Sequence, residues 1–186
     1  MLLKRLLILL AIIATALLIY SAFVENTFSK RLSPKEKVTY QLNDVELEVV
    51  YNRPSKRDRD IFGALVPFNK VWRTGANEAT TFETNTDLMA DGMFLPKGTY
   101  TIWTVPKETQ WTVMFNSKQY DWGVDDELNP LWDPNYDILE LETEVVTLDE
   151  VIEKFTILFE KNNDQLQLTM SWDKTKIAVP LDIMNK

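Results

Sequence analysis

The sequence predicts a mainly β protein, a single antiparallel β-sandwich or flattened barrel preceded by one N-terminal transmembrane helix. Three observations support this prediction. A long apolar run lies close to the N-terminus. Segments that alternate between apolar and polar residues, the pattern of half-buried strands, fill most of the remaining chain. Turn residues separate these segments with no helical pattern between them, which is typical of an all-β architecture of about nine or ten strands.

The apolar run has the length of a membrane span. It covers Leu6–Val24, 19 residues, and as a helix it would cross a hydrocarbon core of about 30 Å. Lys4 and Arg5 come directly before it, so the positive-inside tendency places the N-terminus in the cytoplasm. A cleaved signal peptide is the alternative, but its apolar region is usually shorter, about 7 to 15 residues, and ends at a small-residue cleavage site. Either interpretation exports the rest of the chain.

These features predict three parts of the chain. An uncleaved anchor in the inner (cytoplasmic) membrane would occupy residues 1–24, followed by a tether over residues 25–37. One periplasmic or other extracytoplasmic β domain would occupy residues 38–186. The protein would then be single-pass, with the membrane as its partner through the N-terminal helix.

The expected strands are bounded by recognisable turns. In Val45–Tyr51 the odd-numbered residues are apolar and would share one face, opposite two glutamates. Asp91-Gly92 is the strongest hairpin signal in the chain. The best short candidate for a helix within the domain is Leu148–Lys154. The segments expected as strands are 38–42, 45–51, 80–84, a hairpin within 87–96, 98–106, 110–116, 137–145, 155–160, 165–172 and 175–181.

Composition excludes several kinds of chemistry. The chain has no cysteine and no histidine, which removes disulfides, thiolate nucleophiles, His- or Cys-ligated zinc and Ser-His-Asp catalysis. Its five glycines form no nucleotide-binding motif, so we expect no cofactor and no metal. Apart from Lys4 and Arg5 all charged residues follow the apolar run, which gives the exported part a net charge of −10 against −8 for the whole chain. Nucleic acid is not expected as a partner, because phosphate contacts need a basic surface.

The segment Tyr51–Thr81 departs from the strand pattern. Prolines and glycines along it disfavour regular structure, and so long a loop in a compact domain is usually functional or held by specific contacts. In one interpretation Arg53 or Arg73 pairs with Glu78 and the segment is a structural corner. In the other, its polar groups converge on a pocket that binds a small polar ligand. The candidate binding residues are Arg53, Trp72, Arg73, Asn77 and Glu78.

Several stretches of the chain resemble those of a known family. They are "YNRPS", "IFGALVPF", "VWRTGANEATT", "LPKGTYTIWTVP" and "WTVMFN". These are similar to the hallmark segments of the domain of unknown function 2911 family, exported proteins common in Bacteroidota. The resemblance covers roughly Val38 to Leu181 and implies one β-rich exported domain, but no activity. The hallmark positions that it implies are Arg53, Trp72, Arg73, Gly75, Asn77, Glu78 and Thr80.

The segment Tyr120–Asp137 is an insert that many members of that family lack. It carries six acidic residues and two tryptophans, but not the ligand spacing of an EF-hand calcium loop. Exposed aromatic rings there could stack on sugars. The simpler interpretation is a solvated acidic loop whose aromatic side chains pack back on the sandwich.

Two functional classes follow from these observations. The exported domain is either a non-catalytic binding or envelope-interaction module for a small polar or sugar ligand, or a hydrolase or isomerase. The second would use Glu78 as acid or base, with Arg53 and Arg73 stabilising negative charge. It would also need a titratable group beside Glu78, and the sequence does not fix which way the nearest downstream carboxylate, Glu83, faces. We expect the binding module, with the ligand and the oligomeric state left open.

Overall fold

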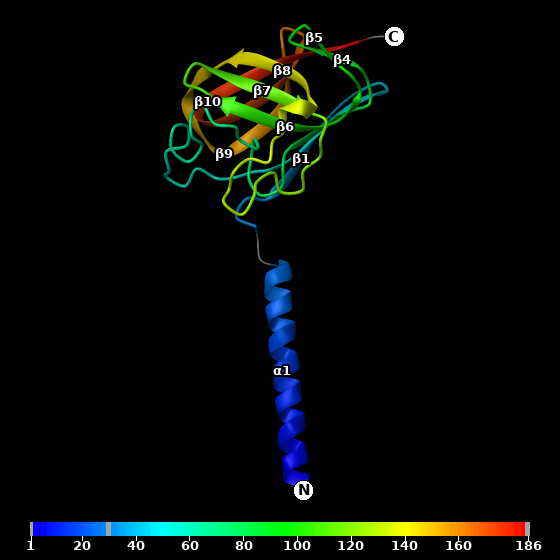
Figure 1. The fold of residues 1–186 in the computed structure, drawn as a ribbon, viewed down its shortest axis with the longest axis vertical. Helices are drawn as coiled ribbons and strands as arrows, with labels where there is room; N and C mark the ends of the chain where they lie inside the picture. The colour runs from blue at the N-terminus through cyan, green and yellow to red at the C-terminus, as the bar shows by residue number, and fades with distance from the viewer. Residues whose placement is uncertain (1, 29–30, 185–186) are drawn as a thin grey trace. The chain divides into compact units, whose positions relative to one another are not determined.

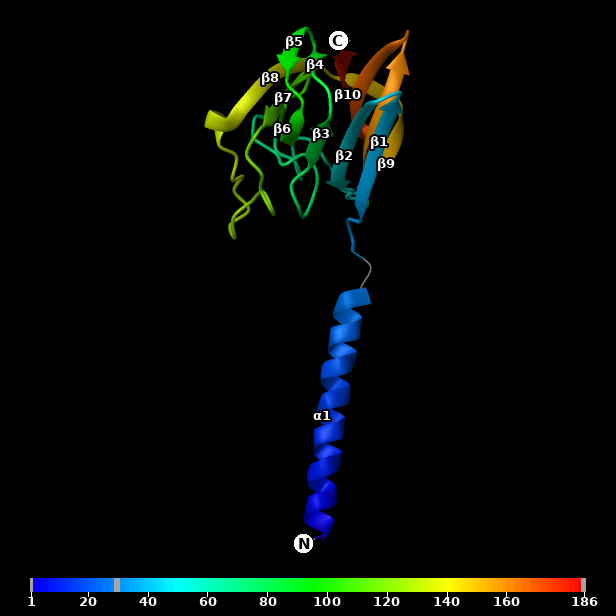
Figure 2. The same ribbon diagram turned by 90° about the vertical axis from the view of Figure 1, so that its right-hand side faces the viewer.

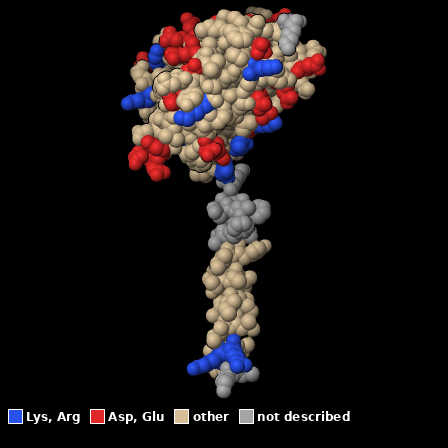
Figure 3. Space-filling model, turned by 45° about the vertical axis from the view of Figure 1, so that its right-hand side comes forward, with Lys and Arg blue, Asp and Glu red and all other residues tan. Residues whose placement is uncertain are grey.

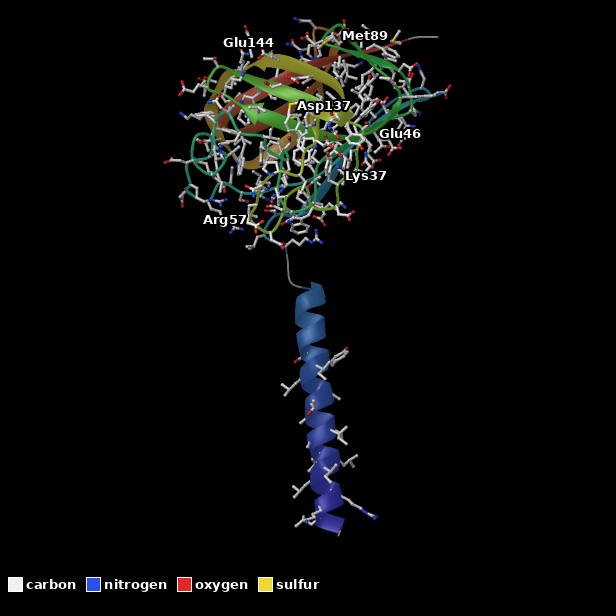
Figure 4. The ribbon with its side chains drawn as sticks, in the orientation of Figure 1. Lys37, Glu46, Arg57, Met89, Asp137 and Glu144 are labelled. Carbon is white, nitrogen blue, oxygen red and sulfur yellow. The ribbon has the colours of Figure 1, made fainter. Side chains whose placement is uncertain are left out.

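The chain begins with one long apolar helix, α1 (Leu2–Phe28), and continues as a β domain (Figure 1). The computed structural model describes residues 2–28 and 31–184. Within α1, Leu3–Ser21 has a mean hydropathy of 2.2 and is long and apolar enough to cross a membrane or to serve as a signal sequence. The described side chains of α1 project outward on all sides (Figure 4). The second compact unit, which holds every strand, begins at Ser33.

The larger of two sheets has six antiparallel strands in the spatial order β1-β2-β3-β6-β7-β8. Strand β1 pairs with β2, and β3 lies between β2 and β6 and pairs with both. The bounds are β1 (Lys35–Leu42), β2 (Val45–Asn52), β3 (Thr81–Thr84), β6 (Gly98–Pro106), β7 (Gln110–Asn116) and β8 (Asp137–Glu144).

The smaller sheet has four antiparallel strands in the order β5-β4-β10-β9. They are β4 (Leu88–Ala90), β5 (Met93–Leu95), β9 (Val146–Asn162) and β10 (Gln165–Ile183). The two sheets share one apolar core and do not close into a barrel. The predicted mainly β architecture is therefore confirmed, as a sandwich.

The core lies where the strand alternation predicted. Along β2, Leu47, Val49 and Tyr51 are all buried, and the intervening residues are more exposed. An aromatic cluster bridges the two sheets at one end: Trp111 from β7, Trp172 from β10 and Phe155 from β9 are each at most 1% exposed. Such aromatic side chains bury large areas, and edge-to-face contacts add about 0.5 to 1.5 kcal/mol per pair.

The short turns between strands have the backbone that their sequences predict. Asp91 and Gly92, between β4 and β5, have φ values of 47° and 76°. Asn163 and Asp164, between β9 and β10, have φ values of 48° and 66°. Two successive positive φ angles match the twist of the flanking strands, and Asn, Asp and Gly reach them at the least cost.

One local expectation is wrong. Leu148–Lys154, the expected short helix, lies within strand β9. It pairs irregularly with β10, with Ile152 opposite Asp173 and Thr147 opposite Thr175. β-branched residues such as Thr147 and Ile152 fit an extended chain, and hydrogen bonds to the partner strand outweigh a weak local preference for helix.

The long loops gather at one end of the sandwich. Figures 1 and 2 show the loop 53–80 and the insert 117–136 at the end where β1 begins, with the β4–β5 hairpin at the opposite end. On the face of the domain shown in Figure 3, acidic and basic side chains are interspersed among uncharged residues, and basic side chains gather at one end of the apolar helix. The candidate residues lie in the segments at this loop end of the sandwich.

Candidate functional site

The segment Val71–Thr81, here called the corner loop, runs along β6 before it enters β3. Trp72 and Thr104 form an isolated antiparallel bridge, in which the Trp72 amide donates to the Thr104 carbonyl at 2.7 Å and the reverse bond is 3.0 Å. Successive side chains of an extended chain point to opposite faces. Trp72 therefore faces the core, and Arg73 faces the outer side of the six-stranded sheet.

Beyond the bridge the corner loop has a strained backbone. Thr74 has a φ of 56° and Asn77 one of 55°, values that are uncommon outside glycine and costly for a β-branched residue. Gly75, at φ 154°, approaches the chain so closely that an added Cβ would lie 3.1 Å from the Asn52 carbonyl oxygen and from Thr80 Oγ1. Thr80 Oγ1 donates to the Thr74 carbonyl at 2.7 Å. The surrounding contacts therefore fix a conformation that the local sequence disfavours.

Trp72 is a core residue. Its ring stacks on Trp172 with centroids 6.2 Å apart and meets Phe155 at 5.0 Å. Its indole Nε1 donates to the Gly75 carbonyl at 3.1 Å. This residue holds the corner loop to the sandwich and is turned away from the outer face.

Arg53 reaches the smaller sheet. Its Nε donates to the Phe155 carbonyl at 3.1 Å and its Nη2 to Thr156 Oγ1 at 2.8 Å, both on β9. Glu36 lies 3.9 Å from its Nη1. Arg53 therefore ties the end of β2 to β9, across the edge of the sandwich.

Asn77 and the backbone of Arg53 hold the chain that enters from the N-terminal side. The Asn77 side-chain amide donates to the Ser33 carbonyl at 3.2 Å, and the Arg53 amide donates to the Pro34 carbonyl at 2.9 Å. The Asn77 side chain thus holds the segment before β1. The corner loop anchors the start of the domain.

Glu78 accepts a hydrogen bond from Asn52 at the end of β2. The distance from Asn52 Nδ2 to Glu78 Oε2 is 2.8 Å, and Asn52 is 1% exposed. The Asn52 Oδ1 atom is buried without a hydrogen-bond partner among the described residues. This contact closes the corner loop against β2.

Arg73 differs from Arg53 in having no polar partner among the described residues. It is half-buried, its Nε is fully buried, and no hydrogen bond or ion pair to it exists among residues 31–184. Burial lowers the pKa of the Arg73 guanidinium below its usual value, although the group stays protonated. A buried polar group without a partner is rare and needs an explanation.

A second unpartnered donor lies next to Arg73. Because Trp72 opposes Thr104, the following residue Arg73 opposes Trp103, and their side chains share the outer face of the sheet. Trp103 is 0% exposed, and its Nε1 has no hydrogen-bond acceptor in the described part of the chain. Trp111 Nε1 is also unpartnered, but this tryptophan lies in the apolar core on the inner face.

The insert covers this part of the outer face. Gly123 packs there so tightly that an added Cβ would lie 3.4 Å from both Arg73 Cβ and Trp103 Cη2, and 3.3 Å from Ala79 Cβ. Tyr120 meets the Trp103 ring edge-on, with centroids 5.1 Å apart. The Arg73 and Trp103 side chains therefore lie between the sheet and the insert, and we call them the outer-face pair.

The rest of the insert is partly packed and partly exposed. Trp132 Nε1 donates to both carboxylate oxygens of Asp137, labelled in Figure 4 at the start of β8, each at 3.1 Å. Trp122 and Tyr136 remain 49% and 46% exposed. Asp125 accepts from the Asn129 side chain, which with backbone donors lowers its pKa. No group of three or more potential metal ligands occurs among the described residues.

The five candidate residues thus lie in different directions. Arg53 contacts β9, Trp72 the core and Asn77 the start of the domain, while Glu78 contacts Asn52. Arg73 has a buried nitrogen that finds no hydrogen-bond partner in the described part of the chain. Glu83, whose facing was open, lines a shallow depression with Glu46, Glu48 and Asn85 on the outer side of the sheet.

Sequence reasoning missed Asn52, Trp103 and Gly123. Trp103 is buried, but on the face opposite the core. The strand alternation of β6 separates Trp103 from Ile102, which is in the core. That alternation could have identified Trp103, because a large aromatic side chain on the outer face of a sheet has to be covered by another segment of the chain.

Comparison with known proteins gives one match. A family model described as "Protein of unknown function (DUF2911)" matches residues 33–181. No curated protein and no solved structure shows a significant match to the chain. The match covers the whole sandwich except the last strand residues.

Proposed function

This chain belongs to the DUF2911 family of proteins of unknown function, and on that premise we propose that it is a membrane-anchored binding module. The exported β domain would hold a small polar ligand at the outer-face pair, Arg73 and Trp103. The apolar helix α1 would keep the domain in the inner membrane with its N-terminus in the cytoplasm and the sandwich in the periplasm. Lys4 and Arg5 before the apolar run support that orientation.

The unpartnered donors of the outer-face pair carry this proposal. Natural domains pair most buried donors, because an unpaired one costs about 1 to 3 kcal/mol. Arg73 and Trp103 are cross-strand neighbours on one face, and Arg73 Nε and Trp103 Nε1 each have that deficit among the described residues. A ligand that accepts from both would remove the cost, which is the arrangement expected of a preorganised binding site.

The backbone of the corner loop supports the same interpretation. Thr74 and Asn77 keep left-handed conformations that cost of order 1 to 3 kcal/mol each, and such strain tends to gather at functional sites. The partnered residues around them, Asn52 with Glu78 and Thr80 with Thr74, hold the loop in place. Rigid support of this kind keeps the Arg73 side chain on the outer face.

The test uses the six tryptophans of the full chain, labelled with ¹⁵N at the indole nitrogen and observed by NMR in detergent micelles. Amino acids, short peptides, sugars and inorganic anions are added one class at a time. We expect at least one class to shift the Trp103 indole resonance saturably, because that N–H would acquire an acceptor. Arg73→Met should abolish the shift.

Trp111 is the matched control, because its Nε1 is also unpartnered but lies in the apolar core. Its resonance should stay in place when Trp103 responds. Trp103→Phe assigns the resonance by removing it. If no class moves the Trp103 signal, or if Trp111 moves equally in every titration, the binding module at this site is wrong.

A further inference from the structure

We propose that the ligand of the outer-face pair is a small carboxylate, a monoanion bound by the Arg73 guanidinium and the Trp103 indole N–H. This inference rests on the proposed binding function and specifies its ligand class. Three properties of the site lead to it: the absence of a carboxylate partner for Arg73, the size of the charge to be matched, and the tight cover of the insert.

Within residues 31–184 Arg73 has no ion pair, although acidic side chains are abundant. It has 28 acidic residues, and the partly buried cations Lys56 and Lys176 pair with Asp173 and Glu160 at 2.8 and 2.6 Å. In the described part of the chain no carboxylate comes within ion-pairing distance of Arg73. A half-buried cation is stabilised by an opposite charge. The guanidinium, with its planar fork of N–H donors, is the side chain best matched to a carboxylate from outside.

The charge balance favours a carboxylate over a phosphate or a neutral sugar. Arg73 supplies one positive charge, and the Trp103 indole N–H supplies a neutral hydrogen-bond donor. A carboxylate would be neutralised, whereas a phosphate dianion would keep excess negative charge in an exported part that already carries a net charge of −10. A neutral sugar would leave the cation uncompensated. The two oxygens of a carboxylate also match the two unpartnered N–H groups.

The insert limits the size of the group that enters. Gly123 has a φ of 80°, and a Cβ added there would lie 3.3 to 3.4 Å from Arg73, Trp103 and Ala79, so the insert packs closely over the pair. The Tyr120 ring closes against Trp103 from the same segment. The insert therefore leaves little open space over the pair, and we expect only a small anion to reach the half-buried Arg73 side chain at the margin of this cover.

The experiment compares sodium acetate, sodium phosphate and glucose on the full chain in micelles, at constant ionic strength set with sodium chloride. The readout is the Trp103 indole resonance, with Trp111 as the internal control. Acetate should shift Trp103 saturably with a millimolar dissociation constant, the scale expected of so small a ligand. Phosphate and glucose should not saturate the signal below tenfold higher concentration.

Arg73→Met should remove the acetate response. Arg73→Lys, which keeps the charge and loses the fork, should weaken it at least tenfold. Arg53→Lys is the control that alters an arginine outside the pair, and should leave the acetate affinity within twofold. Saturation by phosphate or glucose instead of acetate would overturn the carboxylate inference and leave the binding module standing. No response to any probe, here or in the wider screen, would overturn both.

Discussion

The two arginines at the loop end of the sandwich should respond in opposite ways to the same substitution. Arg53→Met removes a guanidinium that makes two hydrogen bonds to β9, at 3.1 and 2.8 Å, with its side chain 29% exposed. Arg73→Met removes a guanidinium that makes none within the described residues. If Arg73 is kept for a ligand, its loss should not destabilise the fold.

The magnitudes follow from these contacts. Hydrogen bonds from a charged donor contribute about 1.5 to 3 kcal/mol each, and the 3.9 Å contact with Glu36 contributes little at the surface. Arg53→Met also leaves the carbonyl of the fully buried Phe155 without this donor. We expect Arg53→Met to lower the free energy of unfolding by roughly 2 to 4 kcal/mol. Arg73→Met should change it by less than about 0.5 kcal/mol or raise it, since methionine keeps the apolar contacts and removes an uncompensated charge.

The assay is urea unfolding of the full chain in detergent micelles, followed by tryptophan fluorescence and repeated with acetate at about ten times its dissociation constant. Ligand binding to the native state should then stabilise the unsubstituted protein and Arg53→Met by about 1.4 kcal/mol, and Arg73→Met not at all. A loss above about 1.5 kcal/mol for Arg73→Met without ligand would refute the reasoning, because it would make Arg73 a structural residue.

Three further predictions test other parts of the interpretation. Mass spectrometry of the protein purified from membranes should find peptides that begin at Met1, because the apolar run exceeds the length of a signal peptide core; a mature terminus beyond the run would contradict an uncleaved anchor. Gly75→Ala should lower the free energy of unfolding, measured with urea, by about 2 to 3 kcal/mol and Gly92→Ala by about 1 kcal/mol. Both glycines have positive φ, but only Gly75 has atoms within 4 Å of the added Cβ. Equal losses would show that the close approach at Gly75 is unimportant. Asn52→Ala and Glu78→Ala should show a coupling free energy of about 1 to 3 kcal/mol in a double-mutant cycle, given their 2.8 Å bond, whereas additive losses would show that the two residues act independently.

Most of the fold could be predicted because its signals are local. The alternation of Val45–Tyr51 gives the buried face of β2, and the Asp91-Gly92 turn appears where the sequence predicts it. The helix expected over Leu148–Lys154 was wrong because the pattern was short, and pairing with a distant strand decided its state. Local preference is decisive only where no long-range partner opposes it.

The candidate site was predictable in composition but not in geometry. Arg53, Trp72, Arg73, Asn77 and Glu78 were identified together because polar and aromatic residues cluster in a loop that has no strand pattern. Their separation follows from backbone directions that such a loop does not reveal. Trp72 and Arg73 are adjacent in sequence, yet they face opposite sides of the sheet because a single bridge to Thr104 extends the chain there.

The sequence by itself determined the apolar helix, the strand segments, the core residues of β2 and the exclusion of thiol and imidazole chemistry, since each depends on residue types and short periodicities. Only the tertiary structure decided that Arg53 is bonded to β9, that Arg73 has no partner in the described part of the chain, and that Trp103 lies beside it. The physical reason is that a hydrogen-bond deficit is a property of all the groups around an atom. Those groups come from β6, the corner loop and the insert, which only the folded chain brings together.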